Sequence, residues 1–175
     1  MKSLERIVER KTAYVCPIFK VETLEVQLEN GKKTTRNVVR HKGAVCVIPF
    51  KDENTVLMVE QFRVALNEFV MEFPAGKLEE GEDPMDCCMR ELEEETSFTS
   101  SNIVYLGKIA TTVGFCDEII HIYKAGNLAK GRNELGDEDE FISVHEISLD
   151  EFKSWVKEGK IIDAKTIAAF GMLNL

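Results

Sequence analysis

Three glutamates near the middle of the sequence stand at spacings that could hold a metal ion. Glu91, Glu94 and Glu95 occupy positions i, i+3 and i+4 of a predicted helix, so their carboxylates converge on one side of it. They also place negative charge at the C-terminal end of that helix, where the helix dipole is already negative. A hard cation such as Mg²⁺ or Mn²⁺, which prefers oxygen ligands, would compensate this charge. For the segment taken alone, the alternative is a solvent-exposed acidic face.

A glycine-rich loop comes directly before this helix. Residues 74–82 read PAGKLEEGE and bring a further carboxylate, Glu82, into the same neighbourhood. Loop and helix together give a fixed series of residues: Gly76, Glu82, Arg90, Glu91, Leu92, Glu94, Glu95 and Phe98. The series resembles the box of the Nudix hydrolase family, Gly-x5-Glu-x7-Arg-Glu-U-x-Glu-Glu-x-Gly-U, in which U is apolar. The one departure is Ser97, which stands where the box has its second glycine.

The resemblance implies roles for the residues of the box. By it, the metal ligands are the carboxylates of Glu91, Glu94 and Glu95 and the backbone carbonyl of Ala75. Glu82 is a supporting carboxylate, and Arg90, a planar and always charged fork, pairs with one of the glutamates and orients it. Glu94 and Arg90 therefore count among the catalytic residues. The implied cofactor is Mg²⁺, which Mn²⁺ could replace.

The departure at Ser97 has a limited expected effect. It falls just past the helix, where a left-handed backbone conformation is common. Serine can adopt that conformation at a cost of about 1 kcal/mol relative to glycine. Because this position ligates no metal, the chemistry should be unaffected.

Segments outside the box resemble the ADP-ribose pyrophosphatase branch of the family, which also handles other nucleoside diphosphate sugars. These segments are EQFR at 60–63, EFPAG at 72–76, VVRHKGAVCVIPF at 38–50 and EGKIIDAKTIAA at 158–169. By that likeness, Arg63 binds the substrate diphosphate through its guanidinium and Arg40 contacts the substrate from the N-terminal part of the chain. A surface salt bridge is the alternative for each arginine. Val113 stands where this branch commonly has proline, which leaves the preference among sugar nucleotides open.

The reaction also needs a base for the attacking water. Residues 136–141, GDEDEF, form an acidic turn at the place where this branch supplies a mobile glutamate. The first candidate is Glu140 and the second is Glu138. A merely solvated acidic turn is the alternative.

The activity implied by the resemblance is Mg²⁺-dependent hydrolysis of ADP-ribose to AMP and ribose 5-phosphate. Two alternatives remain. The substrate could be another sugar nucleotide, such as ADP-glucose or GDP-mannose, or the chain could be a non-catalytic module that senses ADP-ribose. The intact glutamates of the box weigh against the sensor.

The elements that must position these residues follow from capping signals and hydrophobic period. Asp83-Pro84 predicts the start of the helix that carries the box, and a stripe of Met85, Cys88, Met89 and Leu92 should face the core. Further helices are predicted after Ser148 and after Asp163. Continuous apolar runs at 43–50 and 55–62 predict buried strands, and Asn30-Gly31 predicts a hairpin.

This pattern predicts an α/β fold. In the terms of the resemblance, it is the Nudix α/β/α sandwich with a mixed sheet, at residues 41–175. Residues 1–40 should form an antiparallel N-terminal β layer that serves dimerisation and substrate contacts. Because the apolar strands of that layer have little else to pack against, we expect a homodimer.

Composition narrows the partners. The chain has 175 residues and a net charge of -9, which argues against nucleic acid as a partner. The five cysteines follow no disulfide spacing, the N-terminus has no secretory signal, and no apolar run approaches the length of a membrane span. We therefore expect a cytoplasmic protein that acts on a small nucleoside diphosphate sugar and has no membrane partner.

Overall fold

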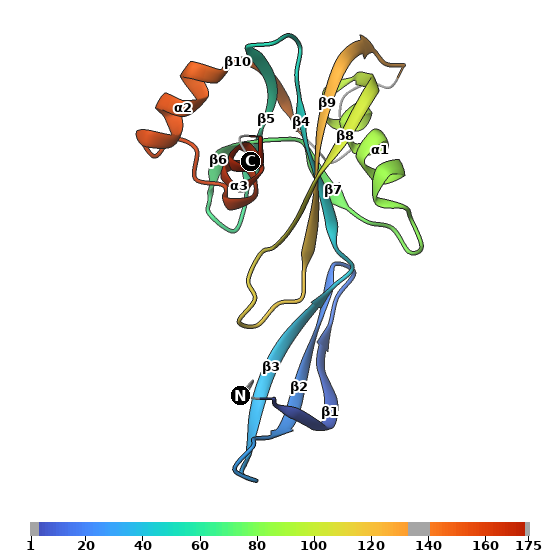
Figure 1. Ribbon diagram of the computed structural model, residues 1–175, viewed down its shortest axis with the longest axis vertical. Helices are drawn as coiled ribbons and strands as arrows, with labels where there is room; N and C mark the ends of the chain where they lie inside the picture. The colour runs from blue at the N-terminus through green and yellow to red at the C-terminus, as the bar shows by residue number, and fades with distance from the viewer. Residues whose placement is uncertain (1–3, 133–140, 174–175) are drawn as a thin grey trace. The chain divides into compact units, whose positions relative to one another are not determined.

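The computed structural model describes residues 4–132 and 141–173. The chain divides into two compact units (Figure 1). The first consists of Met1–Lys42 and Ala110–Ile119, and the second of Gly43–Ile109 and Ile120–Leu175. The segment at 110–119 thus joins the first unit. The sequence-based division at residues 40 and 41 stays a prediction about domains.

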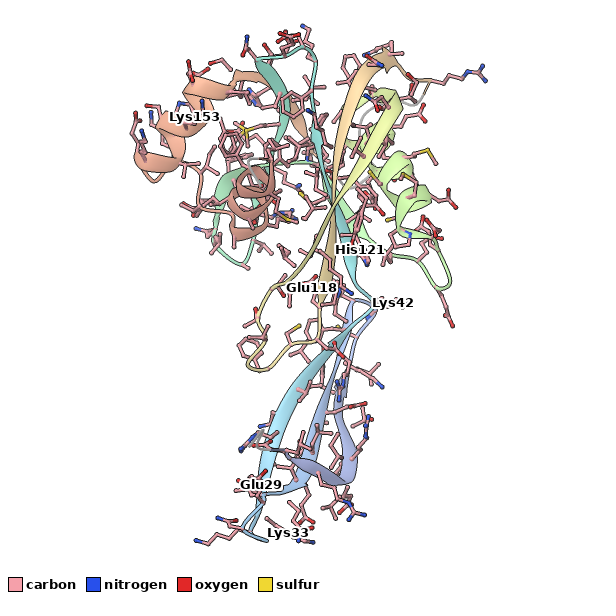
Figure 2. The ribbon with its side chains drawn as sticks, viewed as in Figure 1. Glu29, Lys33, Lys42, Glu118, His121 and Lys153 are labelled. Atoms are coloured by element: carbon pink, nitrogen blue, oxygen red, sulfur yellow. The ribbon has the colours of Figure 1, made fainter. Side chains whose placement is uncertain are left out.

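The first unit contains a three-stranded antiparallel sheet of order β1-β2-β3. Its strands are β1 (Arg6–Val15), β2 (Phe19–Gln27) and β3 (Lys33–His41). The predicted hairpin joins β2 to β3, and Glu29 and Lys33 mark its turn (Figure 2). Gly31 has a φ of 79°, the left-handed conformation for which glycine is favoured at such a turn.

The second unit contains two sheets. One has the order β7-β4-β9-β8, and its strands are β4 (Ala44–Pro49), β7 (Ala75–Lys77), β8 (Phe98–Ala110) and β9 (Ile119–Lys130). The other has the order β10-β5-β6, and its strands are β5 (Thr55–Arg63), β6 (Glu68–Glu72) and β10 (Ser143–Ser148). Since β4 pairs antiparallel with β7 and parallel with β9, the predicted mixed sheet is confirmed.

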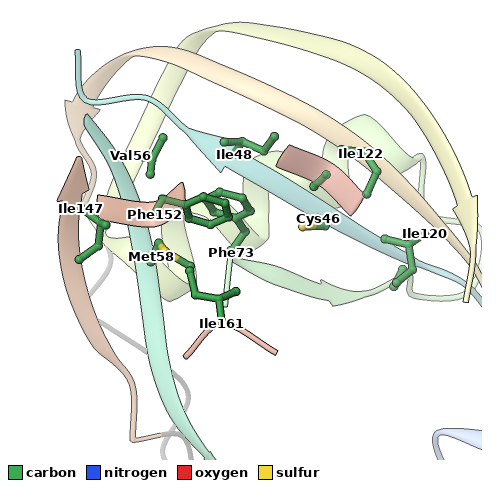
Figure 3. Close-up of a cluster of buried hydrophobic side chains, with 12 residues drawn as sticks. Cys46, Ile48, Val56, Met58, Phe73, Ile120, Ile122, Ile147, Phe152 and Ile161 are labelled. Atoms are coloured by element: carbon green, nitrogen blue, oxygen red, sulfur yellow. The ribbon is translucent and has the colours of Figure 1, made fainter. Parts of the chain in front are cut away.

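The strand β4 is buried on both faces, as its continuous apolar run predicts. One face packs Cys46 and Ile48 into a cluster with Phe73 and Phe152, whose rings stack at 5.3 Å (Figure 3). The other face packs alternate residues of the strand, together with Leu92, into a second cluster. Period-2 alternation thus places helices on both sides of this sheet, and the helix that carries the box covers one of them.

Three helices cover the described part of the second unit: α1 (Pro84–Thr96), α2 (Leu149–Lys157) and α3 (Ala164–Met172). Asp83, Ser148 and Asp163 cap them, each accepting a hydrogen bond from a backbone N–H of the first turn. All three predicted helix starts are confirmed. No helix among the described residues is long and apolar enough to cross a membrane.

The predicted core stripe of α1 needs a correction. Met89 is 44% exposed, and Cys87 takes the place expected for it among the buried residues of the helix. The buried face is therefore centred on Cys87, Cys88 and Leu92, a rotation toward Glu91 and Glu95. This rotation brings two of the box carboxylates closer to the core than the predicted stripe would.

Candidate active site

The exit of α1 has the backbone conformation that the box requires. Ser97 lies in the left-handed region with φ 58° and ψ 23°, and its N–H donates to the carbonyl of Glu93 at 2.8 Å. Ser97 is almost fully buried. The chain therefore makes the left-handed turn expected just past the helix, with serine in place of glycine.

Restoring glycine at this position tests that interpretation. We expect Ser97→Gly to raise the free energy of unfolding by about 1 kcal/mol or less, because glycine reaches positive φ without strain. The turnover number should change by less than about twofold, since Ser97 lies at the helix exit and contributes no side chain to the acidic cluster. Chemical denaturation and steady-state kinetics measure the two quantities, and a large gain in turnover would contradict the prediction.

Arg90 is the centre of the site. Its Nε and Nη2 donate to the two oxygens of Glu82 at 3.0 and 3.1 Å. Its Nη1 donates to Oε1 of Glu91 at 2.8 Å and to Oε2 of Glu94 at 2.9 Å. Arg90 was expected to orient one glutamate; it contacts three.

The charges of this cluster stabilise one another. The hydrogen bonds from Arg90 lower the pKa of Glu82 to about 2, and the same contacts raise the pKa of Arg90. Because the depressed pKa of Glu82 lies well below neutrality, the pair remains ionised throughout the range in which an enzyme assay is run. The supporting role expected of Glu82 thus has a physical basis: it holds the guanidinium that holds the other carboxylates.

Glu95 connects the helix to the glycine-rich loop. It is buried, with 5% of its surface exposed, and its Oε2 accepts a hydrogen bond from the N–H of Ala75 at 2.8 Å. Ala75 begins β7, which pairs with β4 through Cys46. Glu95 therefore fixes the backbone at Ala75, whose carbonyl is the further metal ligand expected from the sequence.

Gly76 is needed because of Glu91. A Cβ added at Gly76 would lie 1.8 Å from both Cδ and Oε1 of Glu91. The first glycine of the box thus leaves room for a carboxylate, and no larger residue fits without moving that carboxylate.

Gly76→Ala is therefore expected to displace the carboxylate of Glu91 and leave the fold standing. The clashing atoms belong to the end of a flexible side chain, which can rotate away. We expect kcat to fall about 10–100-fold, the range seen when groups supporting a metal site are lost. Steady-state kinetics and thermal unfolding check this. Unchanged turnover would show that the position of Glu91 does not matter.

The donor chemistry of the cluster fits a hard divalent cation. Its side-chain acceptors are carboxylate oxygens, which suit Mg²⁺ and Mn²⁺. In residues 4–132 and 141–173, however, no group of three or more His, Cys, Asp or Glu side chains is gathered closely enough to hold an ion. In the structure, Glu91 and Glu94 share one nitrogen of Arg90, and Glu95 bonds to the backbone at Ala75.

Glu93 occupies the variable position of the box, between Leu92 and Glu94. The structure gives it a contact: Oε1 of Glu93 accepts the N–H of Arg132 at 2.8 Å. A Cβ at Gly131 would lie 2.6 Å from the same oxygen. Glu93 therefore ties α1 to the residues that follow β9.

Arg63 lies in an ion-pair network. A salt bridge was the sequence-based alternative for Arg63, but its partners were not predicted. Its Nε and Nη2 donate to the carboxylate of Glu72 at 2.6 and 2.8 Å, and Lys165 donates to the same carboxylate. Glu72 and Lys165 both lie in segments quoted for the family likeness, EFPAG and EGKIIDAKTIAA. The sequence held one signal for this ion pair: Glu72 and Lys165 carry opposite charges, and both lie in segments that resemble the ADP-ribose pyrophosphatase branch.

Arg40 is paired within the first unit. It donates to Glu22 at 2.9 Å and to Asp117 at 3.0 Å, and its pKa is raised by these carboxylates. A cavity of about 300 Å³ in the same unit is lined by Arg40 and by residues of 15–20 and 41–42. The structure thus shows the salt-bridge alternative for Arg40 and for Arg63, and their substrate contacts stay predictions.

The two candidate bases, Glu140 and Glu138, lie outside the described residues. Their role therefore stays a sequence-based prediction.

Comparison with known proteins assigns the family. The model of the NUDIX domain matches residues 40–170. The chain therefore belongs to the NUDIX domain family. A solved structure described as an ADP compounds hydrolase superposes with a TM-score of 0.85 at 19% identity, covering 97% of this chain and 92% of that one, which supports the fold.

Relatives cover nearly the whole chain. A methanol dehydrogenase activator of Bacillus methanolicus is 44% identical over 98% of this chain and 93% of its own length. An ADP-ribose pyrophosphatase of Bacillus subtilis is 39% identical over 100% of this chain and 96% of its own length. A protein of the same description from Mycobacterium tuberculosis is 31% identical over 92% of this chain and 79% of its own length. With the box assembled around Arg90, the chain is a Nudix pyrophosphohydrolase.

Proposed function

We propose that this protein catalyses Mg²⁺-dependent hydrolysis of ADP-ribose to AMP and ribose 5-phosphate. The observation that carries the proposal is the cluster in which Arg90 holds Glu82, Glu91 and Glu94 beside Gly76. Two relatives described as ADP-ribose pyrophosphatases, which match over 100% and 92% of this chain, support this choice of substrate.

The reaction adds water across the diphosphate. The oxygen of water forms a bond to one phosphorus, and the bond from that phosphorus to the bridging oxygen breaks, so that two monophosphates leave. A divalent ion bound at the box carboxylates would neutralise the diphosphate and favour the hydroxide form of water. Glu140 is the proposed acceptor of the proton from water, with Glu138 as the second choice.

Other residues of the chain position the carboxylates and bind the substrate. Arg90 keeps the carboxylates of Glu91 and Glu94 together at 2.8 and 2.9 Å from one nitrogen. Glu95 fixes the backbone at Ala75, whose carbonyl is the further proposed ligand. Arg63 carries a planar fork that matches the diphosphate oxygens, and Arg40 is proposed to contact the substrate.

We also propose that the protein is a homodimer that uses the N-terminal sheet, in the cytoplasm. The strand β1 is exposed along all its described length, which leaves apolar side chains such as Val8 and Tyr14 uncovered in one chain. All five cysteines are free, as a reducing compartment would favour.

A second candidate function comes from the relative in Bacillus methanolicus. Because that protein is described as an activator of methanol dehydrogenase and is 44% identical, this chain is also a candidate regulator of a dehydrogenase. Adding the purified protein to a methanol dehydrogenase and measuring alcohol oxidation tests that role. If variants that lose diphosphate hydrolysis also lose the stimulation of alcohol oxidation, the regulatory role depends on the hydrolase activity.

The direct test of the main proposal is incubation with ADP-ribose and Mg²⁺, with AMP and ribose 5-phosphate identified as products. ADP-glucose and GDP-mannose serve as competing substrates in the same assay. Tight binding of ADP-ribose without release of AMP would favour a sensor. Faster turnover of another sugar nucleotide would keep the reaction and change the substrate.

A further inference from the structure

Glu72 is a buried carboxylate that two cations share. It ends β6, and its side chain is 3% exposed. Arg63 donates to both of its oxygens, from Nε at 2.6 Å and from Nη2 at 2.8 Å. Nζ of Lys165 donates to Oε2, the oxygen that already accepts from Nη2 of Arg63. Lys165 also donates to the helix cap, Asp163, at 3.0 Å.

The two cations differ in what they can reach. The side chain of Arg63 is 41% exposed, whereas that of Lys165 is 14% exposed. Arg63 can therefore meet a dissolved anion without first being uncovered. Lys165 is the more buried of the two and lies in the first turn of α3, with two carboxylates as its partners.

The protonation of this cluster favours ion pairs. Burial raises the pKa of Glu72, but the contacts with Arg63 and Lys165 outweigh it, so that its pKa is lowered overall. Burial lowers the pKa of Lys165, and Asp163 and Glu72 outweigh that effect in the opposite direction. Glu72 is thus an ionised carboxylate in a buried place, where loss of every cationic partner is strongly unfavourable.

We propose that Lys165 is a positioning residue: by neutralising Glu72, it lets the guanidinium of Arg63 leave that carboxylate and bind the diphosphate of the substrate. The inference rests on the proposed function. With Lys165 in place, Glu72 keeps one cation when Arg63 turns away. Without Lys165, Glu72 depends on Arg63, which stays bound to it for more of the time.

The first test is Lys165→Met with ADP-ribose as substrate. If the fraction of molecules in which Arg63 is free of Glu72 falls tenfold, the apparent affinity for the substrate also falls about tenfold. We therefore expect KM to rise about tenfold while kcat changes less than about twofold, the pattern of lost ground-state binding. Lys165→Arg, which keeps the charge, should restore most of the affinity. Lys153→Met removes an exposed lysine on α2 and should leave both constants unchanged (Figure 2).

A second pair of variants separates positioning from direct contact and from stability. In the Glu72→Gln background, Lys165→Met should not change KM, because the charge through which Lys165 acts is gone. If Lys165 contacted the substrate directly, Lys165→Met would raise KM in both the wild-type and the Glu72→Gln background. A merely structural role would lower the melting temperature and kcat instead, as Thr166→Ala should, since Thr166 accepts the N–H of Phe73. The double variant lacks the unpaired buried charge, so it gives a reading even where Lys165→Met alone does not fold.

The outcomes keep the two proposals apart. If the wild type releases AMP but Lys165→Met has the wild-type KM, the role of Lys165 is overturned and the proposed function stands. If the wild type binds ADP-ribose in calorimetry with EDTA but releases no AMP with Mg²⁺, hydrolysis is overturned, and the same variants tested by dissociation constant still decide the role of Lys165. A wild type that neither binds nor hydrolyses ADP-ribose overturns both.

Discussion

Glu94→Gln and Glu95→Gln are each expected to lower kcat for ADP-ribose by more than about 100-fold. Loss of groups that merely support a metal site costs about 10–100-fold, and loss of a ligand should exceed this. Glutamine keeps the shape and one acceptor oxygen, so the replaced side chain at position 95 can still accept the N–H of Ala75. What is lost is the negative charge that a divalent ion needs.

The same two replacements should not lower the stability of the fold, although they lower kcat. Each replacement relieves repulsion between like charges on the same helix face. When Glu94 is replaced, Arg90 loses one ion pair but keeps Glu82 and Glu91 as partners. The free energy of unfolding should therefore stay the same or rise by about 0.5 kcal/mol or less. Kinetics at limiting Mg²⁺ and chemical denaturation measure the two effects. Raising the Mg²⁺ concentration should recover part of the lost rate, since the weakened step is binding of the ion.

Glu93→Gln is the matched control on the same helix. Glu93 accepts the N–H of Arg132 and stands at a position that the box leaves variable. Glutamine preserves that acceptor, and turnover should change by less than about twofold. Wild-type turnover in both Glu94→Gln and Glu95→Gln at limiting Mg²⁺ would show that these side chains only hold Arg90 and Ala75 in place and ligate no catalytic ion.

The local elements were predictable because their signals are local. Asp83, Ser148 and Asp163 each precede a helix and accept a hydrogen bond from its first turn, and that contact depends on a few neighbouring residues. The run at 43–50 predicts a strand buried on both faces because every residue in it is apolar or small. The box fixes the sequence spacing of Gly76 and Glu91, whereas their close approach in space is seen only in the structure.

Contacts between distant segments were not predictable in the same way. Glu93 bonds to Arg132 across 39 positions, and Lys165 bonds to Glu72 across 93. Neither pair follows from the period of a helix or a strand. The prediction of the core stripe of α1 was wrong at Met89 for a related reason. Periodicity alone allows either Met89 or Cys87 to face inward, and packing against β4 selects Cys87.

Glu140→Gln is expected to lower kcat by about 10²–10⁴-fold, the contribution of a positioned general base. Glu140 lies outside the described residues, but the structure describes what flanks its segment. Arg132, the last described residue before it, is bound to Glu93 on the helix of the box, and β10 begins at Ser143. The chain therefore enters the acidic segment from a residue held against the helix that would bind the metal ion.

The two kinetic constants identify the role. A base acts on the attacking water, so KM and the Mg²⁺ dependence should change little, whereas loss of a ligand would change the Mg²⁺ dependence strongly. Glu138→Gln, two positions earlier on the same segment, is the control and should retain most of the activity. If Glu138→Gln is the impaired variant, the base lies at 138. If neither replacement matters, the proton of the attacking water goes to another group, and the acidic turn at 136–141 is only solvated.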